Sequence, residues 1–230
     1  RAAYTTYMTR IFELLGDQAA ADSAAAVIAL ETKIAEVHWA PERQRDIKAI
    51  NNPMDRAGLA KAIPAVDWDI ALEPGGLGKV QHVLVNEISA LKGGTALLDT
   101  EPVAVWQKYL AFHLANQYAN QLPKTFDDAN FAFFGKALRG VEVQRDRWKR
   151  GMVLLDNLIG EGVGQLYVAK HFPPEAKAKA DELVRNLIAA MDKRLAGLEW
   201  MAPETKAKAR AKLAAFTPKI GYPDKWRDYS

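Results

Sequence analysis

Residues Pro173–Leu198, PPEAKAKADELVRNLIAAMDKRLAGL, decide the fold class of this 230-residue chain. Apolar side chains recur there in steps of three and four residues, and such steps place them on one face of a helix. Pro173-Pro174 suits the start of that helix, because proline fits the first turn, where no backbone donor is needed. The apolar face consists of Ala180, Val184, Leu187, Met191, Leu195 and Leu198.

The same helical period dominates the rest of the chain. The one strand-like run is Val80–Val85, and Asp55 and Asn86 are candidate N-caps. We therefore expect a mainly α fold, a multi-helix orthogonal or bundle-like domain with at most one short strand pair, as a single domain over residues 1–230. The other expected helices span Tyr4–Leu15, Ala19–Val37, Asp55–Ile63, Glu87–Leu98, Thr100–Tyr118, Asp127–Gly140, Val143–Lys170 and Pro203–Phe216.

Composition narrows the function classes. The formal charge of +3 is too small to indicate nucleic-acid binding by itself. The absence of cysteine excludes disulfides, thiolate zinc sites and cysteine nucleophiles. No apolar run approaches the roughly 20 residues that span a bilayer, so no membrane segment is expected. The chain starts at Arg1 with neither methionine nor a signal-peptide pattern, and we expect a piece truncated at both ends.

The four histidines do not form a metal-binding pattern. A zinc-peptidase helix needs two histidines four residues apart, so that both rings reach one metal. His38 and His171 are each followed four residues later by a glutamate, Glu42 and Glu175, but prolines interrupt both intervals. Surface or hydrogen-bonded roles are favoured for these two, and equally for the remaining histidines, His82 and His113.

Other catalytic patterns are also missing, so we predict no catalytic and no metal-ligating residue and assign no substrate-binding residue. The three serines lie outside any Gly-x-Ser-x-Gly elbow. The glycine-containing stretches Glu73–Gly78 and Ile159–Gly164 match no phosphate or dinucleotide loop. The adjacent acids Asp127 and Asp128 are expected to cap a helix. The serines are Ser23, Ser89 and Ser230.

The most basic patch is RDRWKR at Arg145–Arg150. It could bind nucleic acid, with arginines on phosphates and Trp148 stacking on a base. The favoured interpretation is a solvated helix face with Trp148 turned inward, and the basic run Lys206–Lys212 is interpreted in the same way. We expect no nucleic-acid partner.

Several long stretches resemble the amino-terminal helical lobe of neprilysin-type zinc metallopeptidases, especially the bacterial members. Their order and spacing follow that lobe along nearly the whole chain, and the last hundred residues are the most specific. The matching stretches are NNPM at Asn51–Met54, TEPVAVWQKYLAFHL at Thr100–Leu114, FDDANFAFFGKALRG at Phe126–Gly140, RDRWKRGM at Arg145–Met152, GQLYVAKHFPPEAKAKADELVRNL at Gly164–Leu187 and LEWMAPETKAKARAKLAAFTPKIGYPDKWRDYS at Leu198–Ser230.

The resemblance implies a cap-lobe fragment of a zinc metalloendopeptidase. The lobe would cover the active-site cavity, limit the size of peptide substrates, and have the catalytic lobe of the same polypeptide as its partner. The zinc would belong to that other lobe, because the His-Glu-x-x-His helix is missing here, and YAN at Tyr118–Asn120 is in the wrong order for the family's Asn-Ala-aromatic stretch. The fragment alone is therefore expected to be inactive, and the parent to be periplasmic, at the cell surface or secreted.

Two points stay open at this level. Arg147 and Trp148 could face the cavity, although a structural role is favoured for both. The alternative function is a stand-alone helical protein-interaction module without catalysis.

The closing stretch Lys219–Ser230 combines a glycine and a proline with three aromatics, so we expect a fixed turn packed against a neighbour. By resemblance, it leads toward the catalytic lobe.

Overall fold

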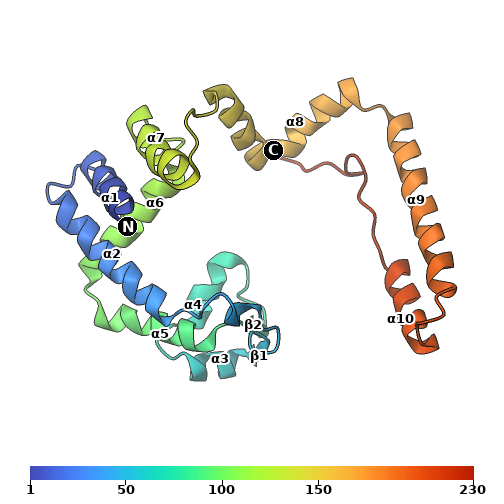
Figure 1. The fold of residues 1–230 in the computed structure, drawn as a ribbon, viewed down its shortest axis with the longest axis horizontal. Helices are drawn as coiled ribbons and strands as arrows, with labels where there is room; N and C mark the ends of the chain where they lie inside the picture. Colours follow the sequence, from blue (N-terminus) through green and yellow to red (C-terminus); the bar gives the residue numbers. More distant parts are fainter. The chain divides into compact units, whose positions relative to one another are not determined.

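The computed structural model describes residues 1–230 as ten α-helices and one two-stranded sheet, which confirms the mainly α prediction. The contacts divide the chain into two compact units, unit 1 (Arg1–Gln144) and unit 2 (Arg145–Ser230), drawn in Figure 1. The single domain over 1–230 stays a prediction. No helix combines the length and the apolar character needed to cross a bilayer.

The main core of unit 1 lies between α1 (Ala2–Leu14), α2 (Ala20–Val37) and α6 (Val103–Tyr118). An aromatic cluster fills it, with Phe112 of α6 ringed by Tyr4, Tyr7 and Phe12 at centroid distances of 6.0–6.1 Å. Tyr7 also donates its hydroxyl to Asn116, 2.7 Å away, so the polar end of the ring is satisfied. The helices of this part are α1 (Ala2–Leu14), α2 (Ala20–Val37), α5 (Ile88–Thr100), α6 (Val103–Tyr118) and α7 (Lys124–Asn130), which continues into the π-helical stretch η3 (Phe131–Ala137).

A smaller core carries the only sheet of the structure. The strands β1 (Asn52–Asp55) and β2 (His82–Val85) pair antiparallel, with Asn52 opposite Val85 and Asp55 opposite His82. Leu59, Ile63 and Val85 form the buried centre. The elements are the one-turn helix η1 (Arg43–Arg45), β1 (Asn52–Asp55), α3 (Arg56–Ala62), α4 (Trp68–Leu72), the one-turn helix η2 (Glu73–Gly75) and β2 (His82–Val85).

Unit 2 consists of α8 (Arg147–His171), α9 (Pro174–Ala196), α10 (Pro203–Ala214) and the closing segment after them. The helix α8 is bent, because Ile159 leaves the helical region with φ −134° and ψ 33°. The basic helix α10 packs beside α9, and Arg210 of α10 makes two hydrogen bonds with the carboxylate of Asp192. All three helices match predicted ones.

Only one of the helix caps predicted from the sequence is present in the structure. Asp55 caps α3 as predicted, accepting a hydrogen bond from the Gly58 amide. The prediction for Asn86 is wrong, because the cap position of α5 is occupied by Glu87 and has no side-chain cap bond. The prediction that Thr100 starts a helix is also wrong: it ends α5, and its hydroxyl donates to the Ala96 carbonyl. A threonine hydroxyl can bond a carbonyl one turn back, so the same residue type also fits the end of a helix.

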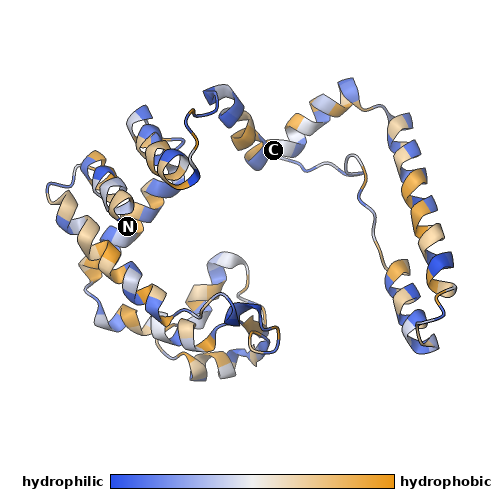
Figure 2. Cartoon of the chain, viewed as in Figure 1, coloured by the Kyte–Doolittle hydropathy of each residue, from blue (hydrophilic) through white to orange (hydrophobic).

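The apolar faces predicted in unit 2 exist, but they are not buried within it. Figure 2 shows apolar residues recurring along α8 and α9. Val163 is half-buried, while Met152, Leu155, Ile159 and Leu166 of α8 keep 40%, 40%, 41% and 76% of their surface exposed. Leu187 and Met191 of α9 keep 60% and 51%. The prediction of a buried stripe on α8 is therefore wrong for this unit, because a helical period marks an apolar face without saying what covers it.

Replacing Phe112 by alanine should destabilise unit 1 strongly. Phe112 is 1% exposed and touches three aromatic rings, and such Phe→Ala changes cost about 3–5 kcal/mol. Chemical denaturation followed by far-UV circular dichroism would measure the loss. Phe216→Ala is the matched control, because Phe216 is 57% exposed and should cost far less. Equal effects of the two substitutions would contradict the assignment of Phe112 to the core.

Acid should weaken the anchor between the α1–α2 loop and α6. The Asp17 carboxylate accepts hydrogen bonds from Lys108, Ser23 and the Ala19 amide at 2.5, 2.7 and 2.9 Å. The three bonds lower the pKa of Asp17 from its ordinary value of 3.8 to about 2, and the bond from Lys108 has the largest effect. The stabilisation is therefore complete above pH 4 and is lost as the pH falls toward 2.

The measurement compares the free energy of unfolding of the wild type and of Asp17→Asn at pH 5, 4, 3 and 2. The difference between the two proteins should shrink from pH 4 to pH 2. Asp22→Asn, an exposed carboxylate in α2, is the control and should show no such trend. A difference that stays constant down to pH 2 would contradict the role of Asp17.

Candidate functional site

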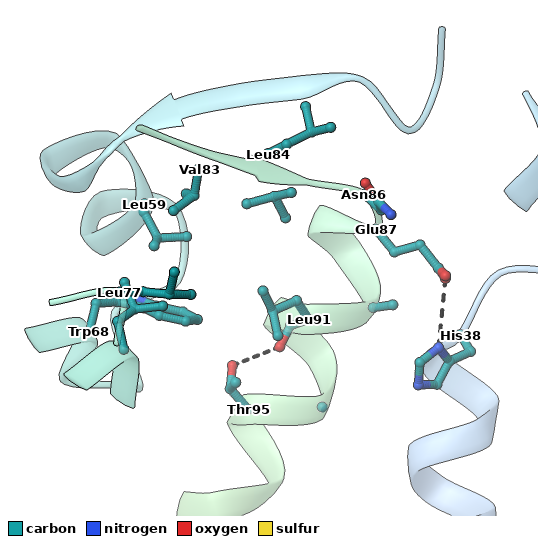
Figure 3. A pocket seen from close by; sticks show the side chains of 14 residues that line it. His38, Leu59, Trp68, Leu77, Val83, Leu84, Asn86, Glu87, Leu91 and Thr95 are labelled. Carbon is teal, nitrogen blue, oxygen red and sulfur yellow. Dashed lines mark hydrogen bonds and ion pairs between the residues drawn. The ribbon is translucent and has the colours of Figure 1, made fainter. Parts of the chain in front are cut away.

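Unit 1 contains an apolar groove of about 560 Å³ between the sheet, α4 and α5. Figure 3 shows it below β2, with Leu91 and Thr95 of α5 on one side and Trp68 and Leu77 on the other. This volume lies within the range of small-molecule pockets. Its lining consists of His38, Leu59, Trp68, Leu72, Leu77, Val83, Leu84, Val85, Asn86, Glu87, Ala90, Leu91, Gly94 and Thr95.

Local sequence explains the walls of the groove. Successive side chains of a strand point to opposite faces, so Val83 points into the groove while Leu84 points to the other face of β2 (Figure 3). The indole of Trp68 is fixed at the start of α4, because its Nε1 donates to the Ile63 carbonyl at 3.0 Å. The groove is a preformed apolar surface. Sequence reasoning missed it, and the run Val80–Val85 was the only signal for it.

Polar groups gather at one end of the groove, where α2 ends and α5 begins. The Glu87 carboxylate accepts from the Trp39 amide at 2.9 Å and lies 3.7 Å from Nδ1 of His38. The Trp39 indole donates to the Ser89 hydroxyl at 2.7 Å. His38 and Ser89, two of the residues tested as catalytic candidates, therefore take part in a structural joint. One imidazole beside one carboxylate can exchange a proton, but it does not supply a zinc ligand set.

The other histidines lie apart from this joint. In the main core, Oε1 of Glu31 lies 3.0 Å from Nε2 of His113 and accepts from the Tyr4 hydroxyl at 2.9 Å. Burial, together with the Glu31 carboxylate, raises the pKa of Tyr4. His82 is exposed on β2, and the ring of His171 lies 4.9 Å from that of Tyr167. No group of three or more His, Asp or Glu side chains could hold a metal ion.

The adjacent acids Asp127 and Asp128 do not cap a helix, contrary to the prediction. The cap position of α7 is occupied by Pro123, and Asp127 is a buried residue inside the helix that accepts from Gln144 at 2.9 Å. Asp128 accepts from Lys124 one turn earlier. The capping prediction is wrong because the helix begins three residues earlier than the sequence indicated. The Ser23 hydroxyl is also engaged, as a donor to Asp17.

The charges of the basic patch Arg145–Arg150 are partly satisfied by groups just before α8. Lys149 lies 2.9 Å from Asp146, and Arg150 donates to the Arg145 carbonyl at 3.1 Å. Trp148 is 67% exposed, so the prediction that it turns inward is wrong for unit 2. The basic run in α10 is a solvated face with local pairs such as Lys208–Glu204 at 2.7 Å.

The closing segment is packed onto unit 2. Gly221 has φ +69°, a conformation that favours glycine, and it forms the expected turn. The Tyr222 ring stacks on Trp226 at 5.7 Å and meets Phe172 edge-on at 5.9 Å. Tyr222 and Trp226 are half-buried, whereas Tyr229 keeps 42% of its surface exposed.

Comparison with known proteins gives a consistent result over the whole chain. The model of the amino-terminal domain of "Peptidase family M13" matches residues 1–223. Zinc metalloprotease ZMP1 of Mycobacterium tuberculosis in its open state is 36% identical, with a TM-score of 0.82, covering 99% of this chain and 36% of that one. PepO of Lactobacillus rhamnosis shares the fold, with a TM-score of 0.79 at 19% identity over 97% of this chain and 36% of that one.

Curated relatives agree with these structures. Human endothelin-converting enzyme 1 is 25% identical over 228 residues, covering 96% of this chain and 30% of the relative. Mouse endothelin-converting enzyme-like 1 is 26% identical over 228 residues, covering 97% and 29%. The chain thus spans about a third of the length of the proteins that it matches.

Proposed function

Since the chain belongs to peptidase family M13, as an amino-terminal domain of these zinc metallopeptidases, we propose that it is the non-catalytic cap of a metalloendopeptidase. In this role it covers the active-site cavity and limits the size of the peptides that enter. The match of the amino-terminal family model to residues 1–223 carries the proposal. The likeness to ZMP1 over 99% of this chain supports it.

The donor groups of this chain do not fit a catalytic zinc. A catalytic site needs three protein ligands around one metal, and no such group is present. His38 and His113 are each held beside a single glutamate, in two different joints of unit 1. We therefore place the zinc, and the metal-assisted hydrolysis that it performs, in the catalytic lobe of the parent polypeptide. The cap contributes walls that exclude bulk water from the reaction.

Exposed apolar faces support a permanent partner for this domain. Leu183, Leu187 and Met191 leave an apolar strip on α9, and contiguous strips of this kind mark interaction surfaces. The proposed partner is the catalytic lobe, and the proposed substrates are peptides. Peptidases of this family are generally extracellular or membrane-anchored, so a periplasmic, cell-surface or secreted location is proposed for the parent.

The same exposed strip on α9 also favours the second candidate, a stand-alone helical module that binds another protein without catalysis. In the first candidate function the strip on α9 contacts the catalytic lobe of the same polypeptide, and in the second it contacts another protein. A catalytic lobe encoded in the same reading frame would support the first candidate, and its absence would support the second.

The isolated chain should neither bind zinc stoichiometrically nor cleave peptides, because its histidines are dispersed, and two of them, His38 and His113, are each held beside a single glutamate. Isothermal titration with zinc would measure the first property, and a quenched fluorescent peptide substrate the second. The zinc metalloprotease ZMP1 serves as the positive control in both assays. Tight one-to-one zinc binding by the chain would contradict the proposal.

A chimera tests the cap role directly. Residues 1–223 of this chain would replace the matching segment of ZMP1, with which the chain is 36% identical. The chimera should cleave short peptides and leave a folded protein uncut, because the cap restricts entry. A chimera with its zinc-binding motif inactivated controls for contaminating peptidases. Cleavage of long and short substrates at similar rates would count against a cap that selects by size.

A further inference from the structure

The bend in α8 coincides with a glycine-rich sequence. Ile159 carries the non-helical backbone angles, and it opens the stretch IGEGVG, which ends at Gly164. Glycine is the weakest helix former after proline, so three glycines within six residues make this part of α8 easy to deform. Sharp bends in helices arise at glycines and where a side chain enters the backbone hydrogen-bond ladder.

The closing residues Thr217–Ser230, here called the strap, meet α8 at this bend. Figure 1 shows the chain returning from α10 to the middle of α8, where the C-terminus lies. The Glu161 amide donates to the Tyr229 hydroxyl at 3.3 Å, two residues beyond Ile159. The Glu161 carboxylate accepts from the Arg227 amide at 2.7 Å. The strap thus bonds both the backbone and the side chain of one residue beside the bend.

Two of these glycines lie close to the strap's aromatic rings. A Cβ atom built on Gly162 would lie 3.7 Å from the Tyr229 ring, and one built on Gly164 would lie 3.4 Å from the Trp226 ring. These are ordinary contact distances for a methyl group, so each ring leaves room for little more than a Cβ atom beside its glycine. Larger side chains at the two positions would push the rings away. The sequence that weakens the helix is therefore the one that receives the strap.

The other end of the strap is anchored on α9. Lys177 donates to the Tyr222 carbonyl at 2.8 Å and to the Asp224 carboxylate at 2.6 Å. Gly221 sets the turn before them, and a Cβ atom there would lie 2.7 Å from the Phe172 ring. The strap is thus fixed at two places, on α9 and at the bend of α8.

We propose that α8 is a two-state joint whose bent state is held by the strap. The Glu161 amide has two possible acceptors: the Tyr229 hydroxyl in the bent helix, or the Asn157 carbonyl in a straight one, where each amide bonds the fourth residue before it. Release of the strap removes the first acceptor and the ring contacts, and α8 straightens. The direction in which α9 and α10 leave the first half of α8 then changes. This inference does not depend on the cap role.

A distance measurement tests the joint. The chain has no cysteine, so cysteines introduced at the exposed residues Val153 and Lys170 carry spin labels at only those two sites of α8. A straight helix separates these positions by about 25 Å, because each residue adds about 1.5 Å. Pulsed electron paramagnetic resonance on the full chain should give a shorter distance in the wild type. The release variant Trp226→Ala with Tyr229→Ala should shift the distribution toward the straight value.

Matched variants separate straightening from general damage. Tyr167→Ala with Trp200→Ala removes the same residue types from exposed positions of unit 2 and should leave the distance unchanged. Tyr229→Phe removes only the hydroxyl and should cause a smaller shift in the same direction. Identical distributions in the wild type and the release variant, with equal helix content, would overturn the proposal. If the release variant loses helix content, Tyr229→Phe decides: a shift supports the joint, and none rejects it.

Discussion

The structure of unit 1 depends on the burial of one face of α1 against α2 and α6. Phe112 belongs to this contact, and Tyr7, Met8 and Ile11 of α1 are buried in the same cluster. Burial of such side chains is the dominant favourable term in folding. Because α2 also packs on α5, the same contact fixes the end of α2 beside the start of α5. The joint at Glu87 and the groove next to it follow from this packing.

Sequence periodicity predicted the helices well, because one helix face repeats every three to four residues whatever lies opposite. It predicted α9 and α10 closely, and the Asp55 cap as well. It could not predict which apolar faces are covered, as the exposed stripe of α8 shows. The prediction that Trp148 turns inward was wrong for the same reason. Burial is decided by distant parts of the chain, which a local pattern does not contain.

The candidate site was less accessible to sequence reasoning than the fold. The groove is formed by Val83, Trp68 and Leu91, which come from three separate elements, and none of them belongs to a motif. The pairing of His38 with Glu87 joins residues 49 positions apart. Family membership, by contrast, could be predicted from the sequence. Long stretches match the family in order and spacing, and agreement over so many positions does not arise by chance. The scattered histidines are consistent with the proposal that this chain is a cap without a zinc site.

The exposed strip on α9 has a consequence for the behaviour of the isolated domain in solution. Leu183, Leu187 and Met191 present apolar surface to water, and two copies can lower their free energy by covering each other's strip. Salts that are excluded from protein surfaces, such as sulfate, strengthen this attraction. Colloidal stability of the domain is therefore governed by concentration and by the choice of salt, even when the fold itself is intact.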